Sequence, residues 1–117
     1  MARKYRMAAL ALTAAGIAAG AASAQELRRN AAAGRQFALH NCDACHVVAT
    51  NQDLRPLIGG YAPSFFEVAN RPDVSADSLR VFLAHQHAYT NMPYPDLTPR
   101  DLADVVSYIV SLRGKRQ

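Results

Sequence analysis

Hydrophobic residues repeat at helical spacing near the C-terminus of this chain. The repeat consists of five apolar residues that share one face of a helix, because they are spaced three or four positions apart: Leu102, Val105, Val106, Ile109 and Leu112. Thr98 precedes them as an expected N-cap, with Pro99 at the first helical position. Asp101 stands where a capping box has Glu or Gln, and Gly114 stands where a C-terminal cap would lie. These signals predict a closing helix that begins after Thr98.

Two shorter segments also carry helix signals. A first helix is expected near Asn30 to His40, with Asn30 as its N-cap and with Gly34 and Phe37 on one face. A short helix is expected around Ser64 to Ala69. The residues between these two segments are rich in loop and turn formers, so an irregular connection is expected there.

A further helix is expected to begin at Ser75. Val74 before this N-cap and Leu79 after it form a hydrophobic staple, and the pattern fades near His85 to His87. The apolar residues on this helix are Leu79, Val81, Phe82 and Leu83. The sequence therefore predicts an all-α fold of three to four helices joined by long loops around one core.

The candidate chemistry lies directly after the first expected helix. Residues 42–46 read C-x-x-C-H, the attachment pattern of a c-type haem. Cys42 and Cys45 can each form a thioether with one of the two vinyl groups on a haem edge. His46 can then place an imidazole nitrogen on the iron as the first axial ligand.

Other interpretations of the two cysteines have less support. A thioredoxin-like pair needs a neighbouring strand-helix-strand pattern, which does not precede Cys42. A zinc site needs about four ligands, and the spacing of His85 and His87 does not suit one. A disulfide between Cys42 and Cys45 would close a very small loop and stabilise the chain little.

Residues 1–24 have the features of a cleaved secretory signal. Arg3, Lys4 and Arg6 precede an apolar run that is shorter than the roughly 20 residues needed to span a bilayer. The expected mature chain, residues 25–117, is a single domain with no other candidate membrane segment. The net charge of +4 comes mostly from the signal, so composition does not favour nucleic-acid binding.

A second axial ligand is expected from the segment between the last two helices. Met92 is the only methionine of the expected mature chain, and Pro93 follows it in a segment that cannot be helical. Its thioether can bind iron opposite His46 and would raise the reduction potential. His85 or His87 is the alternative, which would give two histidine ligands and a lower potential; His40 is expected at the surface or near the haem edge.

With the C-x-x-C-H pattern, the Met92-Pro93 segment and the closing helix, the chain resembles the class I cytochrome c family. It resembles most the small periplasmic monohaem cytochromes of proteobacteria, over about residues 34–112. The resemblance implies the cytochrome c fold, three to four helices around one covalently attached haem c. It also implies that Gly34 and Phe37 pack against Val105 and Tyr108 of the last helix, Val105 replacing the more usual Leu.

The resemblance implies a proline carbonyl that accepts a hydrogen bond from the proximal histidine. Pro63 and Pro56 are the candidates, and Pro63 is favoured by the sequence around it. The chain has no Trp to bond a haem propionate. Three residues are candidate replacements for that role: Tyr61, Arg71 and Tyr94.

These features predict a periplasmic electron carrier rather than an enzyme. His46 and Met92 would hold the iron of one covalent haem c, and transient redox partners, a dehydrogenase or an oxidase, would dock at the haem edge. The expected state is a monomer or a subunit of a redox complex. Two alternatives stay open: a ligand-binding or peroxidase-like haem protein with a labile sixth ligand, and a dedicated cytochrome subunit of a larger oxidoreductase.

Overall fold

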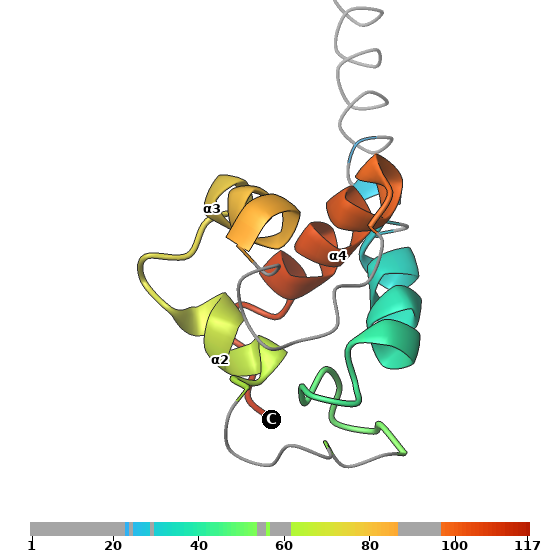
Figure 1. Ribbon diagram of the computed structural model, residues 1–117, viewed down its shortest axis with the longest axis vertical. Helices are drawn as coiled ribbons and strands as arrows, with labels where there is room; N and C mark the ends of the chain where they lie inside the picture. Colours follow the sequence, from blue (N-terminus) through green and yellow to red (C-terminus); the bar gives the residue numbers. More distant parts are fainter. Residues whose placement is uncertain (1–22, 24, 29, 54–55, 57–61, 87–96) are drawn as a thin grey trace, which may run out of the picture.

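The computed structural model describes residues 23, 25–28, 30–53, 56, 62–86 and 97–117 (Figure 1). The described residues form helices and no strand. A first helix, which includes residues 25–28 and 30–41, precedes α2 (Phe65–Asn70), α3 (Ala76–Val81), the π-helical turn η1 (Phe82–Gln86) and α4 (Pro99–Ser111). The all-α fold predicted from the sequence is confirmed.

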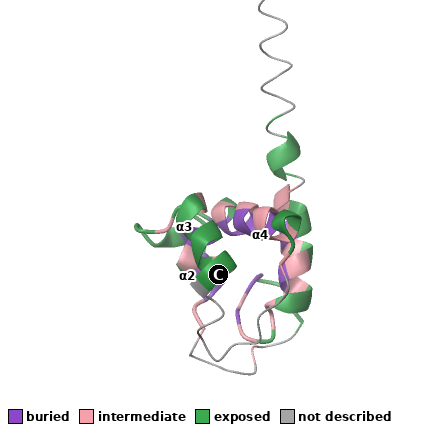
Figure 2. Ribbon diagram, turned by 45° about the horizontal axis from the view of Figure 1, so that its top comes forward, coloured by how far each residue is buried: buried purple, intermediate pink, exposed green. Residues whose placement is uncertain are grey.

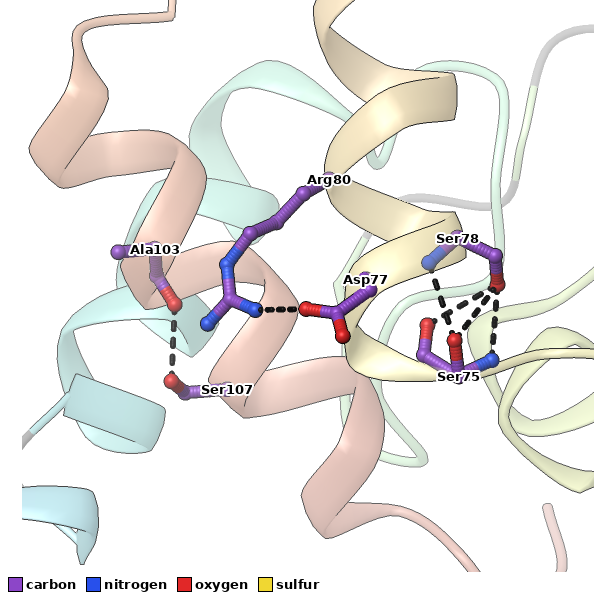
Figure 3. Close-up of polar contacts among 6 residues, drawn as sticks. All are labelled: Ser75, Asp77, Ser78, Arg80, Ala103 and Ser107. Atoms are coloured by element: carbon purple, nitrogen blue, oxygen red, sulfur yellow. Dashed lines mark hydrogen bonds and ion pairs between the residues drawn. The ribbon is translucent and has the colours of Figure 1, made fainter.

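The three labelled α-helices each begin with a reciprocal capping pair. In each pair the N-cap side chain accepts a hydrogen bond from a backbone N–H three residues later, and that later residue's side chain accepts one in return. The pairs are Ser64 with Glu67, Ser75 with Ser78, and Thr98 with Asp101. Figure 3 shows the Ser75–Ser78 pair and the exposed ion pair that follows it. The helix starts expected at Ser64, Ser75 and Thr98 are therefore confirmed.

One detail of the predicted first helix is wrong. Asn30 is itself helical, and residues 25–28 before it are helical too, so Asn30 does not cap the first helix. Asn is a common N-cap residue, but residues 25–28 are already helical, so the helical signal of the earlier residues outweighs the capping preference of Asn30. Of the apolar residues expected on the helix after Ser75, Leu79 is buried, whereas Val81 is 60% exposed and Phe82 is 41% exposed.

Helix α4 is the centre of the packing. Both α2 and α3 pack against it, and its buried positions are visible along its length in Figure 2. The core contains Ala38, Val48, Ala49, Phe65, Phe66, Ala69, Leu79, Val105, Val106, Tyr108, Ile109 and Leu112. Leu102 is only partly buried. The apolar face predicted for the closing helix is therefore the face that organises this core.

The first helix crosses α4 at Gly34. A Cβ atom built on Gly34 would lie 1.9 Å from the Asp104 carbonyl oxygen and 2.9 Å from Cβ of Tyr108. No side chain fits at such a backbone approach, so only glycine lets the two helices cross here. Phe37, one turn later, packs against the core cluster, and Val105 is buried in it. The expected contact of Gly34 with the last helix is thus present, and Phe37 packs against the core to which that helix contributes.

The C-terminal end of α4 is held against α2. Gly114 has a φ of +73°, the left-handed conformation expected of a glycine after a helix. The Asn70 side chain accepts a hydrogen bond from the Gly114 N–H (2.8 Å) and donates to the Phe66 and Lys115 carbonyls (2.7 and 3.1 Å). One side chain therefore joins the end of α2 to the tail that follows α4.

The expected signal segment, 1–24, lies outside the described residues except for Ser23. Among the described helices, none combines the length and apolar composition that crossing a bilayer requires.

Candidate functional site

The C-x-x-C-H pattern forms a tight turn at the end of the first helix. The Cys42 N–H donates to the Ala38 carbonyl at 2.9 Å, which continues the last helical turn. The N–H groups of Cys45 and His46 both donate to the Cys42 carbonyl, at 3.2 and 2.9 Å. The two thiols and the imidazole therefore come from one compact turn, which is what attachment at adjacent points of one haem requires.

Both cysteines are free thiols, and both are half-buried. Burial raises the pKa of the Cys42 thiol to about 11, and the neighbouring Asp43 and Cys45 add to the shift. At neutral pH Cys42 is therefore protonated. Thioether formation adds the sulfur and the hydrogen of such a thiol across a vinyl double bond, so it leaves no charge in this half-buried position.

The His46 ring is fixed by a hydrogen bond to a distant carbonyl. Its Nδ1 lies 2.7 Å from the Pro63 oxygen. Because a carbonyl oxygen only accepts, Nδ1 must carry the proton, and the lone pair of the neutral ring then lies on Nε2. Pro63 rather than Pro56 supplies this contact. The arrangement sets both the tautomer and the direction of the imidazole, as outer hydrogen bonds do for metal-binding histidines.

The His46 side chain is buried, at 8% exposure, and packs against an aromatic ring of α2. The Phe65 ring lies 5.5 Å from the His46 ring, centre to centre, with the planes tilted by 53°. Phe65 in turn lies 6.4 Å from Tyr108 of α4. The Phe65 N–H also donates to the Val47 carbonyl at 2.9 Å, so the start of α2 is joined to the residue after His46.

The loop after the motif is tied to both long helices. The Tyr108 hydroxyl donates to the Val48 carbonyl at 2.7 Å, inside the core. Arg35, on the first helix, donates from Nη2 to Oδ1 of Asn51 at 2.6 Å. Burial raises the pKa of the Tyr108 phenol above its usual value, while the Arg35 guanidinium acts in the opposite direction. Tyr108 therefore stays protonated and serves as a donor.

The other candidate ligands are placed as follows. His40 is exposed, and its Nδ1 lies 2.7 Å from the Gln36 carbonyl. His85 is exposed in η1, where its Nδ1 lies 3.3 Å from the Val81 carbonyl. Four predicted residues lie outside the described part of the chain: Tyr61, His87, Met92 and Tyr94. The axial role of Met92 therefore stays a prediction, as do the candidate bonds to a propionate.

Sequence analysis missed two residues that support the site, Gln52 and the hydroxyl of Tyr108. Tyr108 was expected as a packing residue, but its hydrogen bond to Val48 has no local signal because the two residues are 60 positions apart. Gln52 makes its contacts within the loop, at separations of three to six residues. A polar residue between loop formers gave no reason to single it out.

The residues present fit a haem c group. Two thiols and a histidine with a fixed tautomer lie on one turn, and aromatic and aliphatic side chains pack behind them. Cys42 and Cys45 would hold the macrocycle and His46 would bind its iron. An all-α fold with this site defines the class of small monohaem proteins that carry their haem on two thioethers.

Comparison with known proteins identifies the family. The Cytochrome c family model matches residues 31–113. A cytochrome c-552 of Bradyrhizobium diazoefficiens is 36% identical over 97 residues, which cover 83% of this chain and 88% of that protein. No solved structure matches the chain significantly. The chain belongs to the class I cytochrome c family, and its domain implies a covalently bound haem c and an electron-carrying role.

Proposed function

We propose that this chain is a periplasmic electron carrier in which His46 and Met92 hold the haem iron. The observation that carries the proposal is the hydrogen bond between Nδ1 of His46 and the Pro63 carbonyl, 2.7 Å long. With the proton on Nδ1, Nε2 has the lone pair that can bind iron, and the hydrogen bond makes the imidazole a stronger electron donor. His40 and His85 also have a ring nitrogen near a carbonyl, but that carbonyl lies four residues earlier in each case, and both side chains are exposed.

Fast electron transfer requires that the ligands move little between the two oxidation states. A bound haem c supplies the one-electron chemistry, a change between ferric and ferrous iron. The residues of this chain supply the rigidity: the carbonyl of Pro63 fixes the His46 ring. Phe65 packs against that ring, and Tyr108 packs against Phe65. A buried, hydrogen-bonded ligand resists reorientation, so these contacts suit a carrier better than a protein that exchanges ligands.

Met92 is proposed as the second ligand on sequence grounds. It is the only methionine after the expected cleavage site, and the prolines Pro93 and Pro95 restrict the backbone next to it. Weak thioether ligation opposite a histidine raises the reduction potential, which suits an acceptor of electrons from dehydrogenases.

The periplasmic location rests on the N-terminal sequence. Removal of residues 1–24 would release a chain that begins at Gln25. N-terminal sequencing of the protein recovered from the periplasmic fraction tests this directly: a start at Gln25 supports export with cleavage. An intact residue 1 in the membrane fraction would contradict the proposal that the signal is removed.

The carrier proposal is tested by a redox titration of the haem-loaded protein. It predicts covalent haem, a single reversible one-electron transition, and no binding of carbon monoxide to the reduced protein on the time scale of mixing. Rapid carbon monoxide binding would contradict it and favour the ligand-binding alternative. Replacing Cys42 and Cys45 together by Ala should abolish covalent haem, whereas the control Ala44→Ser, at an exposed position between them, should retain it.

A further inference from the structure

The side chain of Gln52 binds the backbone of the segment that follows the haem-attachment motif. Its Oε1 accepts hydrogen bonds from the N–H groups of Val48 (2.7 Å) and Ala49 (3.2 Å). Its Nε2 donates to the carbonyl of His46 at 3.3 Å. One half-buried amide thus bonds three backbone groups within four consecutive residues.

These backbone groups lie in a segment without helical hydrogen bonds. Residues 47–49 belong to no helix, and Val48 and Ala49 are buried, at 0% and 4% exposure. Buried N–H groups outside secondary structure need a partner, because water cannot reach them. Gln52 supplies for this segment the bonds that a helical turn would otherwise supply.

Gln52 adds to the bonds that hold His46, whose N–H donates to the Cys42 carbonyl at 2.9 Å. The carbonyl of His46 accepts from Gln52, and its ring nitrogen is held by the carbonyl of Pro63. The bond to the carbonyl and the bond to the ring lie at the two ends of the His46 side chain, so a shift of the backbone is transmitted to the ring through two side-chain torsions. The Val47 carbonyl, bonded by the Phe65 N–H at 2.9 Å, keeps the segment against the start of α2, two residues after Pro63.

We infer that Gln52 is a positioning residue for the proximal ligand, acting through the backbone of His46. This inference rests on the proposed function, in which His46 binds the iron. When Gln52 is lost, the backbone of His46 gains freedom and the bond from Nδ1 to Pro63 weakens. The imidazole then donates less charge to iron. Because an electron-rich ligand favours ferric iron, the reduction potential rises.

Three variants of the mature, haem-loaded protein test the inference. Gln52→Met keeps the length of the side chain and removes all three hydrogen bonds. Gln52→Glu keeps an acceptor for Val48 and Ala49 but cannot donate to His46. Gln36→Met is the matched control, because Gln36 is exposed on the first helix. Hydrogen exchange is measured for the Val48 and Ala49 amides and for Nδ1–H of His46, together with the reduction potential.

Gln52→Met should speed hydrogen exchange of the two amides and of the ring N–H by about tenfold or more. In the unsubstituted protein local opening must break the bonds to Gln52, and in this variant those bonds are absent. Its potential should rise above that of Gln36→Met. Gln52→Glu should restore amide protection but still exchange the ring N–H faster. If Gln52→Met takes up no haem, Gln52→Glu still tests the inference. It keeps the bonds to Val48 and Ala49, and exchange of the His46 ring N–H can be measured in it.

Unchanged exchange at the His46 ring in both Gln52 variants would overturn the inference, even if Gln52→Met lowered overall stability. Failure of the proposed function would look different. The optical spectrum of the unsubstituted protein would then show no histidine bound to iron. Hydrogen exchange at Val48 and Ala49 would still be faster in Gln52→Met. The two outcomes are therefore separable in one set of samples.

Discussion

The hydroxyl of Tyr108 donates a 2.7 Å hydrogen bond to the carbonyl of Val48, across 60 positions of sequence. Tyr108 lies on α4, and Val48 lies two residues after His46. Both are buried, at 5% and 0% exposure. The closing helix therefore contacts the proximal loop by a specific polar bond as well as by packing, and this bond is the longest-range support of the candidate site among the contacts described above.

Replacing Tyr108 by Phe should destabilise the haem-loaded protein by about 1–3 kcal/mol. The substitution removes the donor and leaves the buried Val48 carbonyl without that partner. Denaturant unfolding measures the change. The control is Ser107→Ala, on the same helix, whose hydroxyl bonds only the Ala103 carbonyl one turn away (Figure 3). Equal effects of the two variants would contradict a special role for the bond to Val48.

The same variant gives a pH test. Burial raises the pKa of Tyr108 in the folded state, whereas the pKa of the phenol in the unfolded state is about 10. Above that pH the unfolded state releases a proton that the folded state keeps, so Tyr108 stabilises the fold below about pH 10 and less as the pH rises toward its folded pKa. The stability advantage of the unsubstituted protein over Tyr108→Phe should shrink above about pH 10. A constant advantage would contradict this.

Gly34→Ala should destabilise the protein by about 2–4 kcal/mol, measured by the same unfolding experiment. A Cβ atom at Gly34 would meet the backbone of Asp104 at 1.9 Å, so the two helices would have to separate. The matched control is Gly114→Ala, because nothing lies within 4 Å of a Cβ there. Its positive φ alone should cost about 1 kcal/mol. A smaller loss at Gly34 than at Gly114 would contradict the described crossing.

Asn70→Ala should free the C-terminal tail at a cost of about 1–2 kcal/mol. The variant loses the bonds to Gly114 and Lys115, which join α2 to the residues after α4. Proteolysis of the tail and denaturant unfolding report the effect. Asn41→Ala is the control, since the Asn41 amide bonds only the Phe37 carbonyl one turn away. The prediction fails if the tail is cut no faster in Asn70→Ala than in Asn41→Ala.

Met92→Ala should leave the haem attached and lower the reduction potential by on the order of 0.1 V or more, since axial ligands set haem potentials over a range of about 0.8 V. A potentiometric titration measures the shift. His85→Ala serves as the control and should leave the potential nearly unchanged, because His85 is an exposed residue of η1. An unchanged potential in Met92→Ala would exclude Met92 as the ligand.

Helix starts were predictable from sequence because capping is local chemistry. The side chains of Ser64, Ser75 and Thr98 each form hydrogen bonds with the third residue after them. Such pairs can be recognised in the sequence because the two residues are only three positions apart. The haem-attachment turn was predictable for the same reason. The start of the first helix was not, because Asn30 has the composition of a cap while the helix continues through it.

Long-range contacts were predictable only in part. The resemblance to a family pointed to Gly34 and to a proline near His46, and the residues around Pro63 favoured it over Pro56. The 2.7 Å distance from the Pro63 carbonyl to the His46 ring follows from the path of the loop, which the sequence does not give. The hydroxyl bond from Tyr108 to Val48 depends on how the helices pack, which single residues do not encode. Gln52 shows a further limit: its role follows from the direction of its amide, and many loops contain a glutamine with no such role.

The most direct test of the central claim is the optical spectrum of the ferric, haem-matured protein. Ligation of iron by the sulfur of Met92 opposite His46 gives a weak far-red band. Ligation by His46 and Met92 predicts that band in the unsubstituted protein and its loss in Met92→Ala. Bound haem without the band would contradict His46/Met92 ligation and would move the ligand-binding alternative ahead of the electron carrier.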